Sequence, residues 1–101
     1  MERIGQTRQM SPARAAVFEA LKIASPGAFD DRMQRAFVED GSNFQLAELE
    51  MDSLASMEFC IAIELSTGVT LVPAQLAELT STDAVEARLR EMLEARVERS
   101  A

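Results

Sequence analysis

Residues 53–66 hold more apolar side chains than one face of a single helix can carry. The stretch begins at Asp52-Ser53 and ends at Thr67-Gly68, which are typical boundaries of a helix. Besides Ala55, eight apolar side chains lie within the twelve positions from 54 to 65: Leu54, Met57, Phe59, Cys60, Ile61, Ala62, Ile63 and Leu65. Because an ordinary surface helix buries one apolar stripe, this pattern predicts a helix with a buried face and a second, outward apolar face. Either the rest of the chain covers that second face or a partner does.

The first part of the chain predicts one helix followed by a long connection. Ser11-Pro12 is a typical helix start and Ser25-Pro26-Gly27 a typical end, so we expect a helix over about 12–24. Residues 25–49 form the connection, with a short helix capped by Asp30 or Asp31 inside it. Apolar side chains later in the connection are spaced to reach the core from a loop: Phe44, Leu46 and Leu49.

The last part of the chain predicts two helices. Pro73 suits the first turn of a short helix that ends near Leu79. The last helix follows a capping cluster at residues 80–83, with Asp83 and Glu86 as a capping-box-like pair and Glu86–Arg90 as an ion pair on its outer face. The chain of 101 residues is therefore expected to form one all-α domain over residues 11–97, between a flexible N-terminal tail, 1–10, and a C-terminal tail, 98–101.

The composition argues against catalysis by this chain alone. It contains no histidine and one cysteine, which excludes a Ser-His-Asp or Cys-His site, an internal disulfide and a zinc site of the usual kind. Neither a glycine-rich phosphate loop nor a G-x-S-x-G motif is present. We therefore expect a protein that is not an enzyme and that holds no metal. Cys60 is expected to be a small core residue.

The charge of the chain is unevenly distributed. Its net charge is −7, and no Lys or Arg occurs between Arg35 and Arg88. Acidic residues are spread through that span: Glu39, Asp40, Glu48, Glu50, Asp52, Glu58, Glu64, Glu78, Asp83 and Glu86. Such a block repels nucleic acids and anionic membranes and attracts a partner with a basic surface. The alternative is an acidic face that interacts only with solvent.

The start of the sequence and the length of its apolar runs indicate where in the cell the protein is expected. No run approaches the length needed to cross a membrane, and MERIGQTRQM lacks the apolar region of a secretory signal. The default expectation is a cytoplasmic protein.

Several short motifs resemble those of the acyl carrier protein family, which includes the peptidyl carrier domains of modular synthases. Asp52-Ser53-Leu54 resembles the motif at the start of that family's second helix, and Glu58 is a carrier-like acid that follows it. The further matching segments are STGVTL at 66–71, LAEL at 76–79 and TSTDAVEARL at 80–89. The resemblance covers about residues 44–95. It implies a three- to four-helix acyl-carrier-like bundle with a long connection between its first two long helices.

The resemblance also implies a function. In this family the serine of the motif, here Ser53 between Asp52 and Leu54, receives 4′-phosphopantetheine from coenzyme A. A separate phosphopantetheinyl transferase performs the transfer with magnesium. The arm carries an acyl, aminoacyl or polyketide intermediate as a thioester. The partners implied are that transferase and acyl- or aminoacyl-activating and transferring enzymes with basic docking surfaces.

The resemblance assigns the two faces of the apolar helix. Phe59, Ile63 and Cys60 are expected to face the core. Leu54, Met57 and Ile61, with the acids Glu58 and Glu64, are expected to face partner enzymes. In the alternative, residues 25–49 wrap over the helix and bury all eight apolar side chains.

The sequence departs from the family pattern at several positions. Glu50 stands where acyl carriers usually have glycine, and Ala55 stands where fatty-acid carriers often have an acid. The acids late in the helix are reduced to Glu64, which is followed by Leu65 and Ser66. These differences favour a specialised, free-standing carrier of a lipid or secondary-metabolite pathway. We expect the protein to be a monomer. The alternatives are an unmodified carrier-like module that acts only in protein–protein interaction and a small regulatory helix bundle.

Overall fold

The computed structural model describes residues 10–100 and their side chains as far as Arg96. The described residues form an all-α fold, in which Gln45 and Ser81 make an isolated bridge and no strand is present. The elements in chain order are α2 (Pro12–Ala24), α3 (Asp31–Arg35), the π-helical turn η1 (Ala36–Asp40), the 3₁₀ turn η2 (Leu46–Leu49), α4 (Ser53–Thr67), α5 (Pro73–Leu79) and α6 (Thr82–Ser100).

The predicted helices are confirmed, and their ends have identifiable caps. α2 begins where the Ser11 Oγ accepts the Arg14 N–H at 3.1 Å, and α3 begins where Asp30 accepts the Met33 N–H. Gly68 ends α4 in the left-handed conformation, with φ of 81°. Residues 98–100, predicted as part of a C-terminal tail, lie in α6, and the predicted N-terminal tail lies outside the described residues except for Met10.

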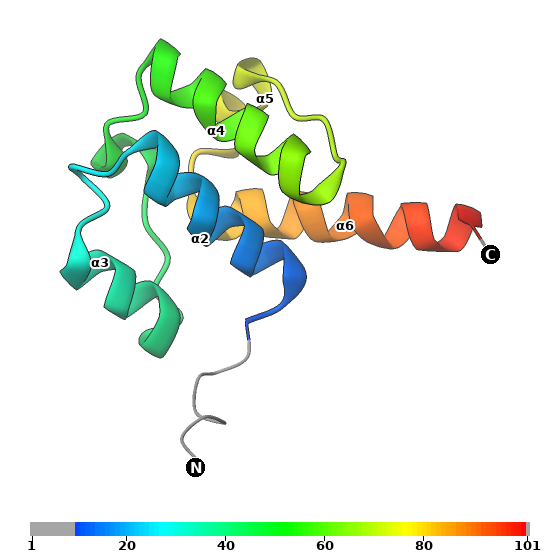
Figure 1. The fold of residues 1–101 in the computed structure, drawn as a ribbon, viewed down its shortest axis with the longest axis horizontal. Helices are drawn as coiled ribbons and strands as arrows, with labels where there is room; N and C mark the ends of the chain where they lie inside the picture. Colours follow the sequence, from blue (N-terminus) through cyan, green and yellow to red (C-terminus); the bar gives the residue numbers. More distant parts are fainter. Residues whose placement is uncertain (1–9, 101) are drawn as a thin grey trace.

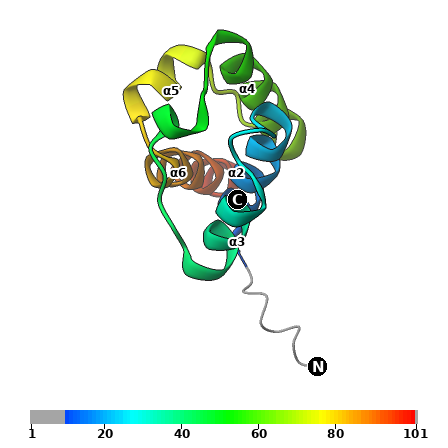
Figure 2. The ribbon, with the colours of Figure 1, turned by 90° about the vertical axis from the view of Figure 1, so that its left-hand side faces the viewer.

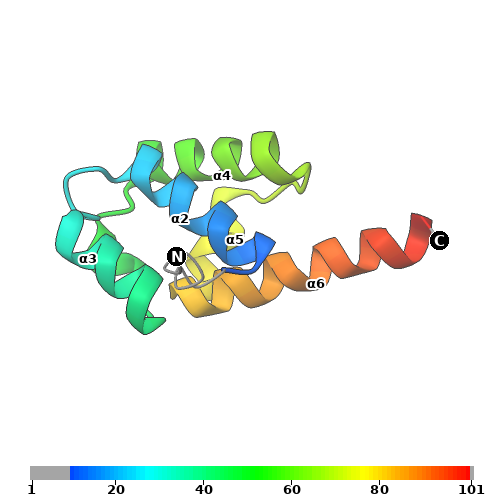
Figure 3. The ribbon, with the colours of Figure 1, turned by 60° about the horizontal axis from the view of Figure 1, so that its bottom comes forward.

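α2 packs against both α4 and α6, so it forms the centre of the bundle (Figure 1). Figure 3 shows α4 and α6 on either side of α2, and the last turns of α6 extend beyond the other helices. The most deeply buried apolar side chains come from all three helices and from the connection: Val17, Leu21, Phe29, Phe37, Leu49, Phe59, Ile63, Val85 and Leu89. This core fixes the orientation of α4.

The long connection lies beside α2 (Figure 2), and its phenylalanines form an aromatic cluster there. Phe29 and Phe37 are fully buried, and their ring centroids lie 5.7 Å apart in an edge-to-face arrangement. Phe18 of α2 lies within 6 Å of both rings, and Phe44 stacks on Phe37. Such aromatic pairs add stability beyond their buried area. Residues 25–49 are therefore packed against α2.

The end of the connection is tied to the junction between α5 and α6. The Leu46 N–H donates to the Thr80 carbonyl at 2.8 Å, and the Thr82 N–H donates to the Phe44 carbonyl at 2.9 Å. Thr82 is completely buried, and its hydroxyl accepts the Phe44 N–H. These bonds set the position of η2, which leads directly into α4.

Glu86 has a different role from the one that the sequence predicted. Its carboxylate accepts from Arg14 Nη1 at 2.8 Å, while Arg14 Nη2 donates to the carbonyls of Phe37 and Ser42. Ser81, not Asp83, caps α6, because its hydroxyl accepts the Ala84 N–H. The predicted Asp83–Glu86 capping box is therefore wrong. The predicted Glu86–Arg90 ion pair is present, but the Glu86 side chain is mostly buried and does not lie on an outer face.

Among the described residues, no helix combines the length and the apolar character that crossing a membrane requires.

Candidate functional site

Asp52, and not Ser53, caps the first turn of α4. The Asp52 Oδ1 accepts the Ala55 N–H at 2.8 Å, and its backbone is extended, as is usual for an N-cap residue. Ser53 is consequently the first residue inside the helix. Ser53 therefore does not cap the helix, because the capping role belongs to its neighbour Asp52.

The Ser53 hydroxyl is exposed, and it makes no hydrogen bond to any other group within residues 10–100. It lies beside the free N–H groups and the positive dipole end of α4, which stabilise an anion there. A phosphate joined to the Ser53 Oγ would lie in this favourable environment. No Lys or Arg is close to Ser53 in the sequence, since residues 36–87 contain neither.

The two other serines of α4 point their hydroxyls into backbone hydrogen bonds. The Ser56 Oγ donates to the Met51 carbonyl at 3.3 Å, and the Ser66 Oγ donates to the Ile63 carbonyl at 3.3 Å. Ser53 is thus the serine of this helix whose hydroxyl is available to react.

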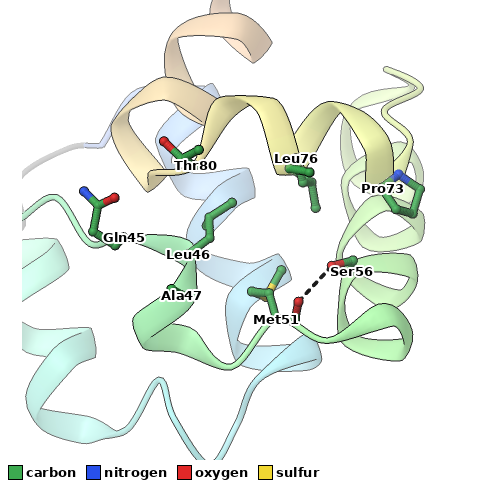
Figure 4. A pocket seen from close by; sticks show the side chains of 9 residues that line it. Gln45, Leu46, Ala47, Met51, Ser56, Pro73, Leu76 and Thr80 are labelled. Carbon is green, nitrogen blue, oxygen red and sulfur yellow. Dashed lines mark hydrogen bonds between the residues drawn. The ribbon is translucent and has the colours of Figure 1, made fainter.

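Ser56 lines a pocket of about 320 Å³ between η2, α4 and α5 (Figure 4). Met51, Leu76 and Pro73 line it as well, so it flanks the first turn of α4. Figure 4 shows the Ser56 hydroxyl directed at the backbone of Met51. The Ser56 hydroxyl is therefore held by the backbone of Met51, whereas the Ser53 hydroxyl is exposed.

Glu50 stands where acyl carriers usually have glycine, and its backbone adopts the left-handed conformation that glycine favours. Its φ is 53° and its ψ is 47°, a region that costs a residue with a Cβ atom about 1–2 kcal/mol. The Asp52 N–H donates to the Glu50 carbonyl at 2.9 Å. The tight turn that leads into α4 is therefore formed although the glycine is absent.

The two-faced interpretation of α4 agrees with the exposure of its side chains. Phe59 and Ile63 are fully buried, and Cys60 is buried. On the opposite side, Leu54 is 64%, Met57 51% and Ile61 53% exposed. We call Leu54, Met57 and Ile61 the outer row. The alternative in which residues 25–49 bury all eight apolar side chains is wrong, because the connection packs beside α2.

Acidic side chains accompany the outer row along α4. Asp52 and Glu64 are exposed, and Glu58 is half-buried. Leu65, to which the sequence assigned no role, is 83% exposed. The sequence contains the spacing that places Leu65 beside the outer row, since Leu65 follows Ile61 by four residues, about one turn of a helix.

The buried Cys60 thiol is poorly suited to chemistry. Burial removes the thiolate from water and raises the pKa of this thiol. Because the thiolate is the reactive form, both burial and the raised pKa slow its reactions.

We expect Cys60 in the unmodified protein to react with a disulfide reagent much more slowly in the native state than in guanidinium chloride at the same pH. Because the pKa of Cys60 is raised, its reaction rate in the native state should still increase with pH in the range where an exposed thiol is already fully ionised. The time course of reagent release measures both rates. Equal rates in the native and unfolded protein would contradict the buried position of Cys60.

No metal site is evident in the described part of the chain, where His, Cys, Asp and Glu side chains form no group of three or more able to hold an ion. Comparisons of the chain with protein-family models, with curated proteins and with solved structures find no match in any of the three.

Proposed function

We propose that this protein is an acyl carrier protein that bears 4′-phosphopantetheine on Ser53. The observation that carries the proposal is the exposed, unbonded Ser53 hydroxyl at the first position of α4, directly after the capping Asp52. The Asp52-Ser53-Leu54 motif and the order of the helices support it further. The fold is accordingly proposed to be a carrier bundle with a packed connection between α2 and α4.

The attachment is a phosphoryl transfer to the Ser53 hydroxyl. The Ser53 Oγ forms a bond to the phosphorus that carries the pantetheine, and the diphosphate bond of coenzyme A breaks. Adenosine 3′,5′-bisphosphate leaves, and a base of the transferase takes the hydroxyl proton. The chain contributes the exposed oxygen and the positive end of α4 beside it.

When bound, the group supplies a thiol that holds a cargo as a thioester. The chain itself then presents that cargo, which explains why it needs no catalytic side chains. Tethering holds the cargo at a high effective concentration near any enzyme that docks on the carrier. The outer row and the acids Glu58 and Glu64 are the proposed docking surface for such enzymes.

Intact-mass measurement after incubation with a phosphopantetheinyl transferase, magnesium and coenzyme A tests the proposal. We expect the mass to increase by one phosphopantetheinyl group, and one fast-reacting thiol to appear beside the slow Cys60. Omission of coenzyme A is the control. An unchanged mass with transferases of both narrow and broad specificity would contradict the proposal and favour a module that binds partners without an arm.

Association with the transferase is expected to depend on salt. The acids along α4 attract a basic surface, and exposed charges are screened beyond roughly 8–10 Å at physiological ionic strength. The association rate constant, measured by stopped flow, should therefore fall as sodium chloride is raised. The variant Glu64→Gln should bind more slowly at low salt and show a weaker salt dependence. An association rate that does not change with salt would contradict this account of docking.

A further inference from the structure

Leu65 continues the outer row to the C-terminal end of α4. At 83% it is the most exposed of the large apolar side chains in the described part of the chain. Leu54, Met57, Ile61 and Leu65 follow one another at steps of three or four residues, so they lie along one side of the helix. They extend over about 16 Å, at 1.5 Å per residue. A single exposed leucine is ordinary, but a continuous apolar row is typical of a binding surface.

The last turn of α4 holds Leu65 on a fixed backbone. The Gly68 N–H donates to the Glu64 carbonyl at 2.8 Å, and the Thr67 hydroxyl donates to the Ile63 carbonyl at 2.7 Å. From α6, Arg96 Nη1 donates to the Thr67 carbonyl at 2.7 Å. Because this turn is already ordered, docking on Leu65 does not require further ordering of the backbone, a cost that weakens many interfaces.

The charges around the row determine what can cover it. Asp52, Glu58 and Glu64 lie on the same helix, and residues 36–87 contain no base. A second copy of this face would bring acids against acids, which is unfavourable. An enzyme with basic side chains around an apolar groove is complementary to it.

We propose that Leu65 is a docking residue that enters an apolar pocket on the phosphopantetheinyl transferase, so that the enzyme contacts the whole outer side of α4. The inference rests on the proposed function and adds to it a specificity-determining residue. Leu65 acts through binding and takes no part in the transfer to Ser53. Its loss should therefore weaken binding of the carrier without slowing the chemical step.

Steady-state kinetics of the transferase with carrier variants test the inference. Leu65→Asn removes the apolar contact without adding charge, and Leu65→Met retains it. Ile23→Asn is the matched control, because Ile23 is 59% exposed but lies on α2. We expect the KM for Leu65→Asn to rise about tenfold with kcat unchanged, as expected for loss of part of a buried leucine contact.

Leu65→Met and Ile23→Asn should retain the KM of the unsubstituted protein. Urea denaturation should show that all three variants remain as stable as that protein, since exposed positions contribute little to stability. An unchanged KM for Leu65→Asn would overturn the inference while leaving the proposed function in place. An equal rise for Ile23→Asn would also overturn it, because the effect would then not be specific to α4. If the unsubstituted protein is not modified at all, the proposed function fails and this inference with it.

Discussion

Phe59→Ala is expected to lower the free energy of unfolding by about 3–5 kcal/mol, the usual cost of removing a buried phenylalanine. Phe59 is 0% exposed on the core face of α4. The cavity left behind would lie in the hydrophobic core that α4 shares with the other helices. Such a loss is a large part of the total stability of a small domain, so we expect the variant to remain folded only at low temperature.

Met57→Ala is the matched control on the opposite face of the same helix. Met57 is 51% exposed, so its truncation should cost at most about 1 kcal/mol. Urea denaturation followed by circular dichroism gives both values. The transferase should accept Met57→Ala less well although the fold survives. Equal destabilisation by the two substitutions would contradict the two-faced interpretation of α4.

Ser53→Ala is expected to abolish modification by the transferase and coenzyme A. The substitution removes the only oxygen that the proposal assigns to the arm. The fold should be unaffected, because Asp52 provides the cap and alanine is a good helix former; the free energy of unfolding should change by no more than about 0.5 kcal/mol.

Ser56→Ala is the control for Ser53→Ala. It removes a hydroxyl that lies three residues further along α4 and is bonded to the Met51 carbonyl. Intact-mass measurement should show full modification of Ser56→Ala and none of Ser53→Ala. Modification of Ser53→Ala at the rate of the unsubstituted protein would contradict the assignment.

Local patterns predicted most of the helices. The Ser-Pro start of α2, the Asp52 cap and the Gly68 end of α4 each depend on residues within a few positions of one another, so the sequence displays them directly. The presence of a second apolar face on α4 also followed from the number of its apolar residues, whereas the assignment of Phe59 to the core and of Met57 to the outside was implied by the resemblance to acyl carrier proteins.

Interactions between distant residues could not be predicted in this way. Glu86 pairs with Arg14, 72 residues away, and nothing in the local pattern separates that role from a capping box. The packing of Phe29, Phe37 and Phe44 against Phe18 also depends on how the connection folds back on α2. The sequence has Glu50 in place of the usual glycine, so it gave no sign of a left-handed residue. The turn before α4 nevertheless holds the Glu50 backbone in the left-handed conformation.

The most direct test of the central claim is to locate the added group within the modified protein. Cleavage after glutamate releases residues 51–58, a peptide that contains Ser53 and Ser56 and ends at Glu58. Fragmentation of that peptide by tandem mass spectrometry distinguishes the two serines. The account predicts one phosphopantetheinyl group, carried entirely by Ser53. A group on Ser56, or an unmodified 51–58 peptide from protein that has gained mass elsewhere, would contradict it.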